Sequence, residues 1–293
     1  MKVVPTIFLL SLSLLLASCG VDQSAPGGSG LIESTEIIVS SEAAGKLEAV
    51  FFEEGDKIIA GDTIGIIDTT TVALNLDRAR AVRRAAVTQT ELAVLNKEQA
   101  AYNFDLAQKE FDRMTALIKS GSVNQQQYDK AENTFNLASL AKRQAAAALD
   151  AARADLNKID AEIALLDKRL RDCFPVAPMS GYMTDKFIDP GELAGVGTPF
   201  VKISRLDTVW VKVYLPPADL TGIRLNDRAE IDPEDGGDAV PGYITWISSE
   251  AEFTPKNVQT REARADLVYA VKITIPNPDE RLKIGMPVSV TIP

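Results

Sequence analysis

Few side chains in this sequence are suited to chemistry. The 293 residues include two cysteines, Cys19 and Cys173, and no histidine. Histidine is the commonest general base and transition-metal ligand, so its absence excludes histidine-based catalytic triads and histidine-ligated zinc sites. The acidic turn at 232–238 lacks the ligand spacing of an EF-hand calcium loop. These residues therefore predict a protein that is not an enzyme and holds no metal ion or cofactor.

Cys19 stands where a lipid is attached to exported bacterial proteins. Lys2 precedes a short apolar run at 7–16, as in a signal peptide. This run is shorter than the roughly 20 residues that a membrane-spanning helix needs, and no later segment is apolar enough to cross a membrane. The sequence LASCG at 16–20 resembles a lipobox, whose cysteine is acylated and becomes the new N-terminus. We therefore expect a signal peptide at 1–19, lipidation of Cys19 and a periplasmic location, with an ordinary signal peptide as the alternative.

The net charge and the remaining cysteine limit the classes of partner and of covalent link that we expect. The net charge of −10 argues against binding to nucleic acid and against broad electrostatic attachment to anionic lipid. Residues 21–30 read VDQSAPGGSG, which predicts a flexible tether over 20–35. Once Cys19 is acylated, Cys173 has no partner for a disulfide, so we expect it to be buried and inert.

Two segments match each other at a constant offset and without a gap. The first is GKLEAVFFEEGDKIIAGDTIGIID, and the second is GYMTDKFIDPGELAGVGTPFVKIS. The match superimposes three pairs of glycines, at places where tight turns favour a residue that tolerates positive φ. The pairs are Gly45 with Gly181, Gly55 with Gly191, and Gly61 with Gly197. Each copy is too short to bury its own core, but two copies related by a pseudo-twofold axis can pack as a sandwich.

The two copies are separated by about 100 residues of strong helix formers, with no proline and one glycine. In the second half of this insertion, thirteen positions from Tyr128 to Leu170 recur at alternating steps of three and four, and only Lys142 among them is not apolar. This spacing is typical of a coiled-coil seam, so we expect an antiparallel helical hairpin over 72–171. With about 47 residues in each arm, the hairpin should reach roughly 70 Å.

The first arm is less regular, and its end is marked by a turn. Leu92 and Leu95 suit one phase of the seam, while the residues from Phe104 to Ile118 suit another, so we expect a stutter between them. Gly121 is expected just after the first helix, and Asn124 or Ser122 is expected to cap the second.

Short alternating strands follow after residue 204. They lie at 208–215, 228–231, 242–248, 269–275 and 288–292, separated by turns rich in glycine and proline, and they predict a small β-barrel. The fold class is therefore α+β multidomain. The expected domains are the signal peptide at 1–19, the tether at 20–35, an interrupted β-domain at 36–71 and 172–204, the α-helical hairpin at 72–171, and the β-barrel at 205–293.

The interrupted repeat resembles the lipoyl/biotinyl barrel-sandwich hybrid as it occurs in periplasmic adaptors of the membrane fusion protein (HlyD) family. In carrier domains of this type, the two repeats meet at a hairpin whose tip bears a modifiable lysine. Here the corresponding residues 69–71 are three threonines, which argues against a carrier of lipoate or biotin. The segment at 253–260, FTPKNVQT, and the last strands resemble the β-barrel domain of the same family.

The hairpin tip carries part of a family motif. Many adaptors that dock onto a TolC-like channel carry Arg, Leu and Ser at the tip, with steps of four and seven residues. Arg113 and Leu117 match this pattern, and Asn124 stands in place of the serine. The resemblance implies that these three residues contact the channel, through hydrogen bonds from the guanidinium and the amide and through an apolar knob.

The resemblance implies an adaptor that links an inner-membrane transporter to a TolC-like outer-membrane channel during efflux or secretion. It also implies assembly into a ring, with a hexamer as the expected number, and anchoring in the inner membrane facing the periplasm. The segment at 253–260 and the end of the sequence after the barrel favour an ABC-type transporter, with a proton-driven RND pump as the alternative. The rivals from other classes are an enzyme and a stand-alone structural coiled-coil lipoprotein.

Overall fold

The computed structural model describes residues 26–234, 236–253 and 267–293. The expected signal peptide, Cys19 and nearly all of the segment at 253–260 lie outside these residues. The chain forms two compact units. One, here called the hairpin unit, comprises residues 38–179 and 183–202, and the other, the barrel unit, comprises the described residues up to 37, 180–182 and those from 203 onward. Neither of the long helices is apolar enough over a sufficient length to cross a membrane.

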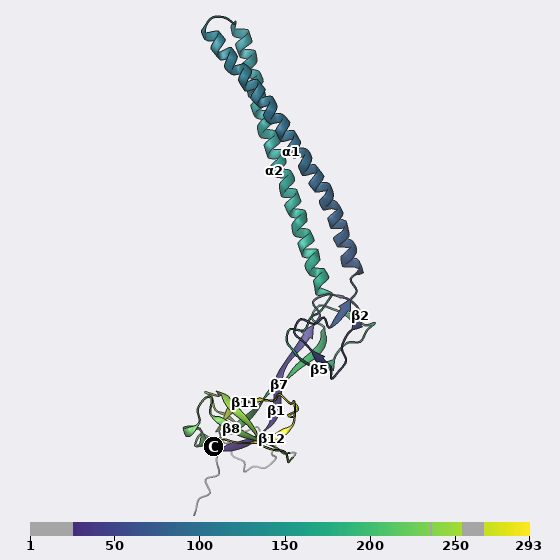
Figure 1. Cartoon of the computed structure of the whole chain (residues 1–293), viewed down its shortest axis with the longest axis vertical. Coiled ribbons are helices and arrows are strands. Elements are labelled where there is room, and N and C mark those ends of the chain that lie inside the picture. The colour runs from purple at the N-terminus through teal and green to yellow at the C-terminus, as the bar shows by residue number, and fades with distance from the viewer. Residues whose placement is uncertain (1–25, 235, 254–266) are drawn as a thin grey trace, which may run out of the picture. The chain divides into compact units, whose positions relative to one another are not determined.

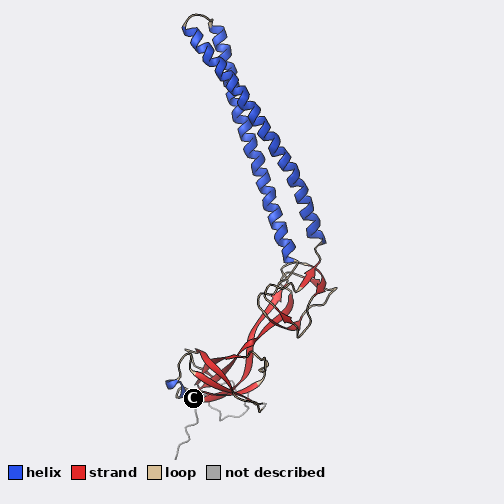
Figure 2. Ribbon diagram, viewed as in Figure 1, coloured by secondary structure: helices blue, strands red, loops and turns tan. Residues whose placement is uncertain are grey.

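Two long helices make up most of the hairpin unit. They are α1 (Thr70–Lys119) and α2 (Gln125–Asp172), which pack side by side in opposite directions (Figures 1 and 2). All thirteen seam positions expected on α2 are buried or half-buried, and Leu149 is only 2% exposed. Lys142, the exception in the apolar series, places its Nζ 4.2 Å from the centre of the Phe104 ring. The seam predicted for the second arm is therefore confirmed.

The stutter expected in the first arm is wrong, because α1 keeps a single phase. Its buried and half-buried seam side chains are Leu76, Ala79, Ala86, Thr90, Ala93, Ala100, Phe104, Ala107, Phe111, Met114 and Ile118. Leu92 and Leu95 lie off this seam and are 50% and 59% exposed. Alanine and threonine form the middle of the seam because small side chains allow the helices to approach closely. Hydrophobicity alone therefore pointed to the wrong face of the helix.

The β-domain of the hairpin unit is built from short strands. They are β2 (Gly45–Val50), β3 (Lys57–Ile58), β4 (Gly65–Ile67), β6 (Leu193–Ala194), and parts of β5 (Gly181–Lys186) and β7 (Pro199–Leu215). The two copies of the repeat exchange equivalent hydrogen bonds. Gly55 N donates to Met183 O and Gly191 N donates to Leu47 O, both at 2.8 Å. In the sequence match Gly191 is the counterpart of Gly55, and Met183 is the counterpart of Leu47. This reciprocity is that of a pseudo-twofold axis, as the repeat predicted.

The exchange also shows that the repeat begins earlier than the sequence match. Gly61 N donates to Ala177 O and Gly197 N donates to Ser41 O, again at 2.8 Å. Ser41 and Ala177 are separated by the same offset as the matched glycines, although both precede the matched segments. Identical side chains are not needed at these two positions, because the bonds involve backbone atoms. Sequence similarity therefore did not reveal them.

The six turn glycines fall into two groups. Gly55, Gly61, Gly191 and Gly197 have φ between +85° and +103°, which L side chains rarely adopt. Gly45 and Gly181 instead lie against the last strand of their own repeat. A Cβ atom would lie 2.8 Å from Ile67 at Gly45 and 2.5 Å from the Ser204 carbonyl oxygen at Gly181. Both groups have the same members in each copy, as the match of the glycines predicted.

A matched pair of substitutions tests the requirement for positive φ. Gly197→Ala should lower the free energy of unfolding by about 1–2 kcal/mol, because the Cβ atom of alanine makes the left-handed backbone conformation at φ +85° unfavourable. Gly195→Ala, two residues earlier, should change it by less than about 0.5 kcal/mol, because its backbone is not left-handed and its nearest contact would be 3.5 Å away. Thermal and urea unfolding measure both variants. Equal losses would show that φ is not the cause.

The barrel unit is a closed antiparallel sheet. Among the described residues, six strands close it in the order β11-β9-β8-β12-β1-β7, with β7 pairing back to β11. Their bounds are β1 (Gly27–Ser40), β7 as given above, β8 (Arg228–Pro233), β9 (Val240–Ile247), β11 (Leu267–Pro276) and β12 (Pro287–Thr291). The short β10 (Glu252–Phe253) pairs with β11, and a 3-10 turn, η1, spans Asp219–Gly222. Inward valines and isoleucines of all six strands, such as Val211, Ile244 and Ile273, form one fully buried core.

The boundary of the expected tether needs correction. Residues 27–35, assigned to the tether, belong to β1, which pairs with β12 from Gly27 to Leu31. Ile32 on this strand is completely buried. The glycines at 27, 28 and 30 suggested a flexible linker, but two of them are required by close packing. A Cβ atom at Gly27 would lie 2.3 Å from the Val290 carbonyl oxygen, and one at Gly30 would lie 2.6 Å from that of Lys212.

Candidate functional site

The turn between α1 and α2 is fixed by backbone hydrogen bonds. Gly121, at φ +67°, follows the last turn of α1 as expected. Its N–H donates to Ile118 O at 3.1 Å, and the N–H of Ser122 donates to Leu117 O at 3.0 Å. These two bonds form a Schellman motif, which satisfies the last carbonyl groups of the helix. The tip of the hairpin is therefore an ordered turn.

Asn124 caps the second helix. Its Oδ1 accepts a hydrogen bond from Gln127 N at 2.9 Å, and its own N–H donates to Gln127 Oε1 at 3.2 Å. Together they form a capping box. The sequence left the cap open between Asn124 and Ser122, and the structure assigns it to Asn124. The amide oxygen is thus engaged in the fold, and the Nδ2 group is the part of this side chain left to donate to a partner.

The other two expected contact residues lie one helical turn apart on α1. Arg113 is 66% exposed, and its guanidinium forms a salt bridge of 3.0 Å with Glu110. Leu117 is half-buried, and its carbonyl oxygen also accepts a bond of 2.9 Å from the Ser120 hydroxyl. Side chains four residues apart share a face of a helix, so a cation and an apolar side chain are presented together beside the turn.

An aromatic cluster supports the tip from within the seam. The Phe111 ring stacks on Phe135 with centroids 5.2 Å apart and lies 5.6 Å from Tyr128, while Phe104 lies 5.4 Å from Phe135. Beside the cluster is a groove of about 290 Å³, which sequence reasoning missed. It is lined by Ala107, Glu110, Met114, Gln127, Lys130, Ala131 and Thr134. In the sequence, the signal that could have predicted this groove is the pair of small seam residues, Ala107 and Ala131, next to large aromatic residues.

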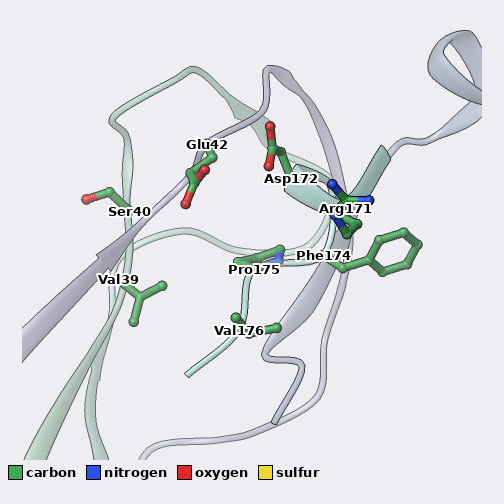
Figure 3. A pocket seen from close by; sticks show the side chains of 8 residues that line it. All are labelled: Val39, Ser40, Glu42, Arg171, Asp172, Phe174, Pro175 and Val176. Carbon is green, nitrogen blue, oxygen red and sulfur yellow. The ribbon is translucent and has the colours of Figure 1, made fainter. Parts of the chain in front are cut away.

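At the base of the hairpin, an exposed ion pair connects α2 to the loop after β1. Lys168 donates to the carboxylates of Asp172, at 2.7 and 2.8 Å, and of Glu42, at 3.3 Å. The bond to Asp172, followed by that to Glu42, raises the pKa of Lys168. Glu42 and Asp172 also line a hollow of about 360 Å³ with Val39, Ser40, Arg171, Phe174, Pro175 and Val176 (Figure 3).

The remaining candidates for chemistry are the thiol of Cys173 and the place of the carrier lysine. Cys173 is buried, and desolvation followed by the charges of Asp172 and Asp68 raises the pKa of its thiol. Asp68 precedes the threonines that stand at the place of the carrier lysine. Hydrogen bonds from the side chain of Thr70 and then from its backbone N–H, which donates to Asp68 Oδ1 at 2.8 Å, lower the pKa of Asp68. Within the part of the chain that the structure describes, no three Cys, Asp or Glu side chains are grouped to hold a metal ion.

Comparison with known proteins finds relatives that match nearly the whole length of the chain. No family model matches the sequence. A UPF0194 membrane protein of Acidithiobacillus ferridurans is 28% identical over 294 residues, which cover 90% of this chain and 86% of the relative. A UPF0194 membrane protein of Yersinia pseudotuberculosis is 29% identical over 290 residues, covering 90% of this chain and 88% of the relative.

Solved structures share the fold. MacA from Actinobacillus actinomycetemcomitans matches with a TM-score of 0.67 at 18% identity, covering 92% of this chain and 79% of MacA. The membrane fusion protein Spr0693 from Streptococcus pneumoniae matches with a TM-score of 0.55 at 15% identity, covering 90% of this chain and 97% of Spr0693. The relatives match nearly the whole chain, and the solved structures confirm the fold that the interrupted repeat, the hairpin and the barrel predicted: in sequence the chain is similar to UPF0194 membrane proteins, and in fold to a membrane fusion protein.

Proposed function

We propose that the chain is a periplasmic adaptor that links an inner-membrane transporter to a TolC-like outer-membrane channel for export and catalyses no reaction itself. The observation that carries this proposal is the hairpin. Each helix has about 50 residues and therefore a length of roughly 75 Å, and it ends in an ordered tip that presents Arg113 beside Leu117. A long rigid arm with an exposed cation and an apolar side chain at its end is suited to binding a distant protein.

The other parts of the proposal concern anchoring and assembly. Acylation of Cys19 would hold the chain to the inner membrane on its periplasmic side. Several copies would form a ring, with six as the favoured number. Exposed apolar residues on α1 support side-by-side packing of hairpins, because Leu92, Leu95, Tyr102 and Leu106 recur at heptad spacing on the face away from the seam. An ABC-type transporter is favoured by the sequence at 253–260, and an RND pump is the alternative.

Site-specific crosslinking in cells tests the link to the channel. A photo-crosslinking residue at position 117 should capture an outer-membrane channel protein, because Leu117 lies at the tip. The same residue at Lys158, exposed in the middle of α2, should not capture that protein. Capture of the channel from both positions, or only of neighbouring copies of this chain from position 117, would contradict the proposal.

A further inference from the structure

One outer face of the barrel unit is basic and aromatic, although the chain as a whole carries a charge of −10. We infer that this face, on strands β7, β9 and β11, binds the headgroups of an anionic phospholipid surface. Its central side chains are Trp210, Lys212, Trp246 and Lys272, which with Thr245 line a shallow depression of about 440 Å³. The proposal extends the proposed function, because it brings the barrel unit to the membrane that would hold the lipid anchor.

The strand register creates this face. Lys212 on β7 lies directly opposite Lys272 on β11, and Lys272 lies opposite Trp246 on β9. Like charges opposite each other in an antiparallel pair are destabilising. No ion pair involves either lysine among the residues that the structure describes. Within the described part of the chain, two cations thus lie together without an ion pair to a carboxylate, an arrangement that a bound anion would stabilise.

The tryptophans orient the two lysines. Lys272 Nζ lies 4.1 Å from the centre of the Trp210 ring, and Lys212 Nζ lies 6.0 Å from that of Trp246. Each cation–π contact uses one side of the ammonium group and leaves N–H donors for another acceptor. Trp246 is 43% exposed and Tyr243 beside it is 47% exposed. Tryptophan and tyrosine side chains favour the headgroup region of a membrane, because they combine an apolar ring with a polar group.

The composition around the centre is consistent with an anionic surface as partner. The other outward side chains of the three strands here are neutral: Thr208, Tyr214, Tyr243, Thr245 and Thr274. Arg228, on the adjacent β8, is opposite Tyr243 and extends the basic face, while carboxylates lie at its margin, at Asp207 next to Thr208 on β7 and at Glu230 opposite Pro241. Lys212, Lys272 and Arg228 thus give the centre of this face three cations, and its carboxylates lie at the margin.

The chain length favours lipid over another acidic surface. Residues 20–26 connect the expected lipid attachment at Cys19 to the start of β1 in the same unit. At full extension they span at most about 25 Å, so acylation of Cys19 would keep this barrel close to the membrane surface. Each lysine or arginine near an anionic bilayer contributes about 1 kcal/mol. Two lysines therefore correspond to a roughly 30-fold change in affinity.

The chain contains only two tryptophans, and both belong to this face, so intrinsic fluorescence reports on it directly. The test uses the mature Cys19→Ser chain, residues 19–293, with vesicles of about three parts phosphatidylcholine to one part phosphatidylglycerol. We expect a blue shift of the tryptophan emission on binding to these vesicles. The shift should be absent with pure phosphatidylcholine and should decrease with added salt.

Lysine variants separate this face from the overall charge. Lys212→Glu with Lys272→Glu should weaken vesicle binding by at least about 30-fold. Lys109→Glu with Lys158→Glu, at exposed positions on the hairpin, changes the net charge equally and should leave binding unchanged. Absence of a blue shift in the unsubstituted chain, or equal losses in the two double variants, would overturn the inference. Because the test protein has no acyl chain, a failure here is distinguishable from a failure of anchoring at Cys19, which mass measurement of the mature protein detects.

Discussion

Leu166→Asp is expected to open the hairpin and abolish export. Leu166 is 9% exposed and packs in the seam with Leu76 and Ala79. Removal of a buried leucine costs about 2–5 kcal/mol, and a carboxylate without a partner adds a desolvation cost. Circular dichroism in the far ultraviolet, which reports helix content, should show a lower melting temperature for the helical signal. Export in cells should fall to the level of a strain without the adaptor.

The neighbouring leucine provides the control. Leu165→Asp introduces the same carboxylate one position earlier, but Leu165 is 51% exposed and faces away from the seam. Its effect on the free energy of unfolding should be within about 0.5 kcal/mol, as for other surface substitutions. If the two variants melt at the same temperature, burial in the seam is not what stabilises the hairpin.

How much of the hairpin could be predicted from the sequence depended on how regular the hydrophobic pattern of each helix is. In α2 the thirteen seam positions are nearly all apolar, so their period alone identified the buried face. In α1 the seam passes through Ala86, Thr90 and Ala93, while the larger Leu92 and Leu95 lie outside it. A hydrophobic pattern weights large side chains, whereas close helix packing favours small ones. The phase of the seam on α1 is set by packing against α2, and the sequence of the first arm alone does not contain this information.

In the β-domain and the barrel, too, the sequence predicted the features that depend on residue type and missed those that depend on backbone position or strand pairing. The glycine repeat predicted the pseudo-twofold arrangement, because positive φ restricts the residue type at Gly55 and Gly191. It could not predict the hydrogen bonds of Ser41 and Ala177, which depend on backbone position alone. In the barrel, alternation predicted the strands but not which of them pair. The basic face arises from the closure of β7 on β11, which brings Lys212 opposite Lys272 although the two strands are distant in sequence.

At the tip, Arg113, Leu117 and Asn124 stay a predicted contact site, and the structure gives Asn124 and Arg113 different local partners. Asn124 caps α2 through Gln127, whereas Arg113 is 66% exposed and forms a salt bridge with Glu110. A residue that both caps a helix and contacts a partner would affect stability and binding together. A residue that only contacts a partner would affect binding alone, and substitutions distinguish the two cases.

Arg113→Glu is therefore expected to prevent docking without loss of stability. Loss of a central arginine from an interface costs at least about 2 kcal/mol, or roughly 30-fold in affinity, and the reversed charge adds repulsion. Within the chain it removes only an exposed salt bridge, worth less than about 1 kcal/mol. Capture of the channel by a crosslinker at position 117 and export should both fall strongly, with the melting temperature nearly unchanged. Lys97→Glu, exposed further down α1, makes the same charge change and should retain export.

Asn124→Asp isolates the contribution of the third tip residue. The carboxylate can still accept the hydrogen bond from Gln127 N, and a negative charge at a helix N-terminus is favourable, so the cap should persist. The Nδ2 donor is lost, and so is any hydrogen bond from it to the channel. If Asn124 contributes to docking, this variant should fold normally but show weaker crosslinking from position 117. Full crosslinking by Asn124→Asp, together with loss in Arg113→Glu, would show that docking depends on α1 and that Asn124 serves only the turn.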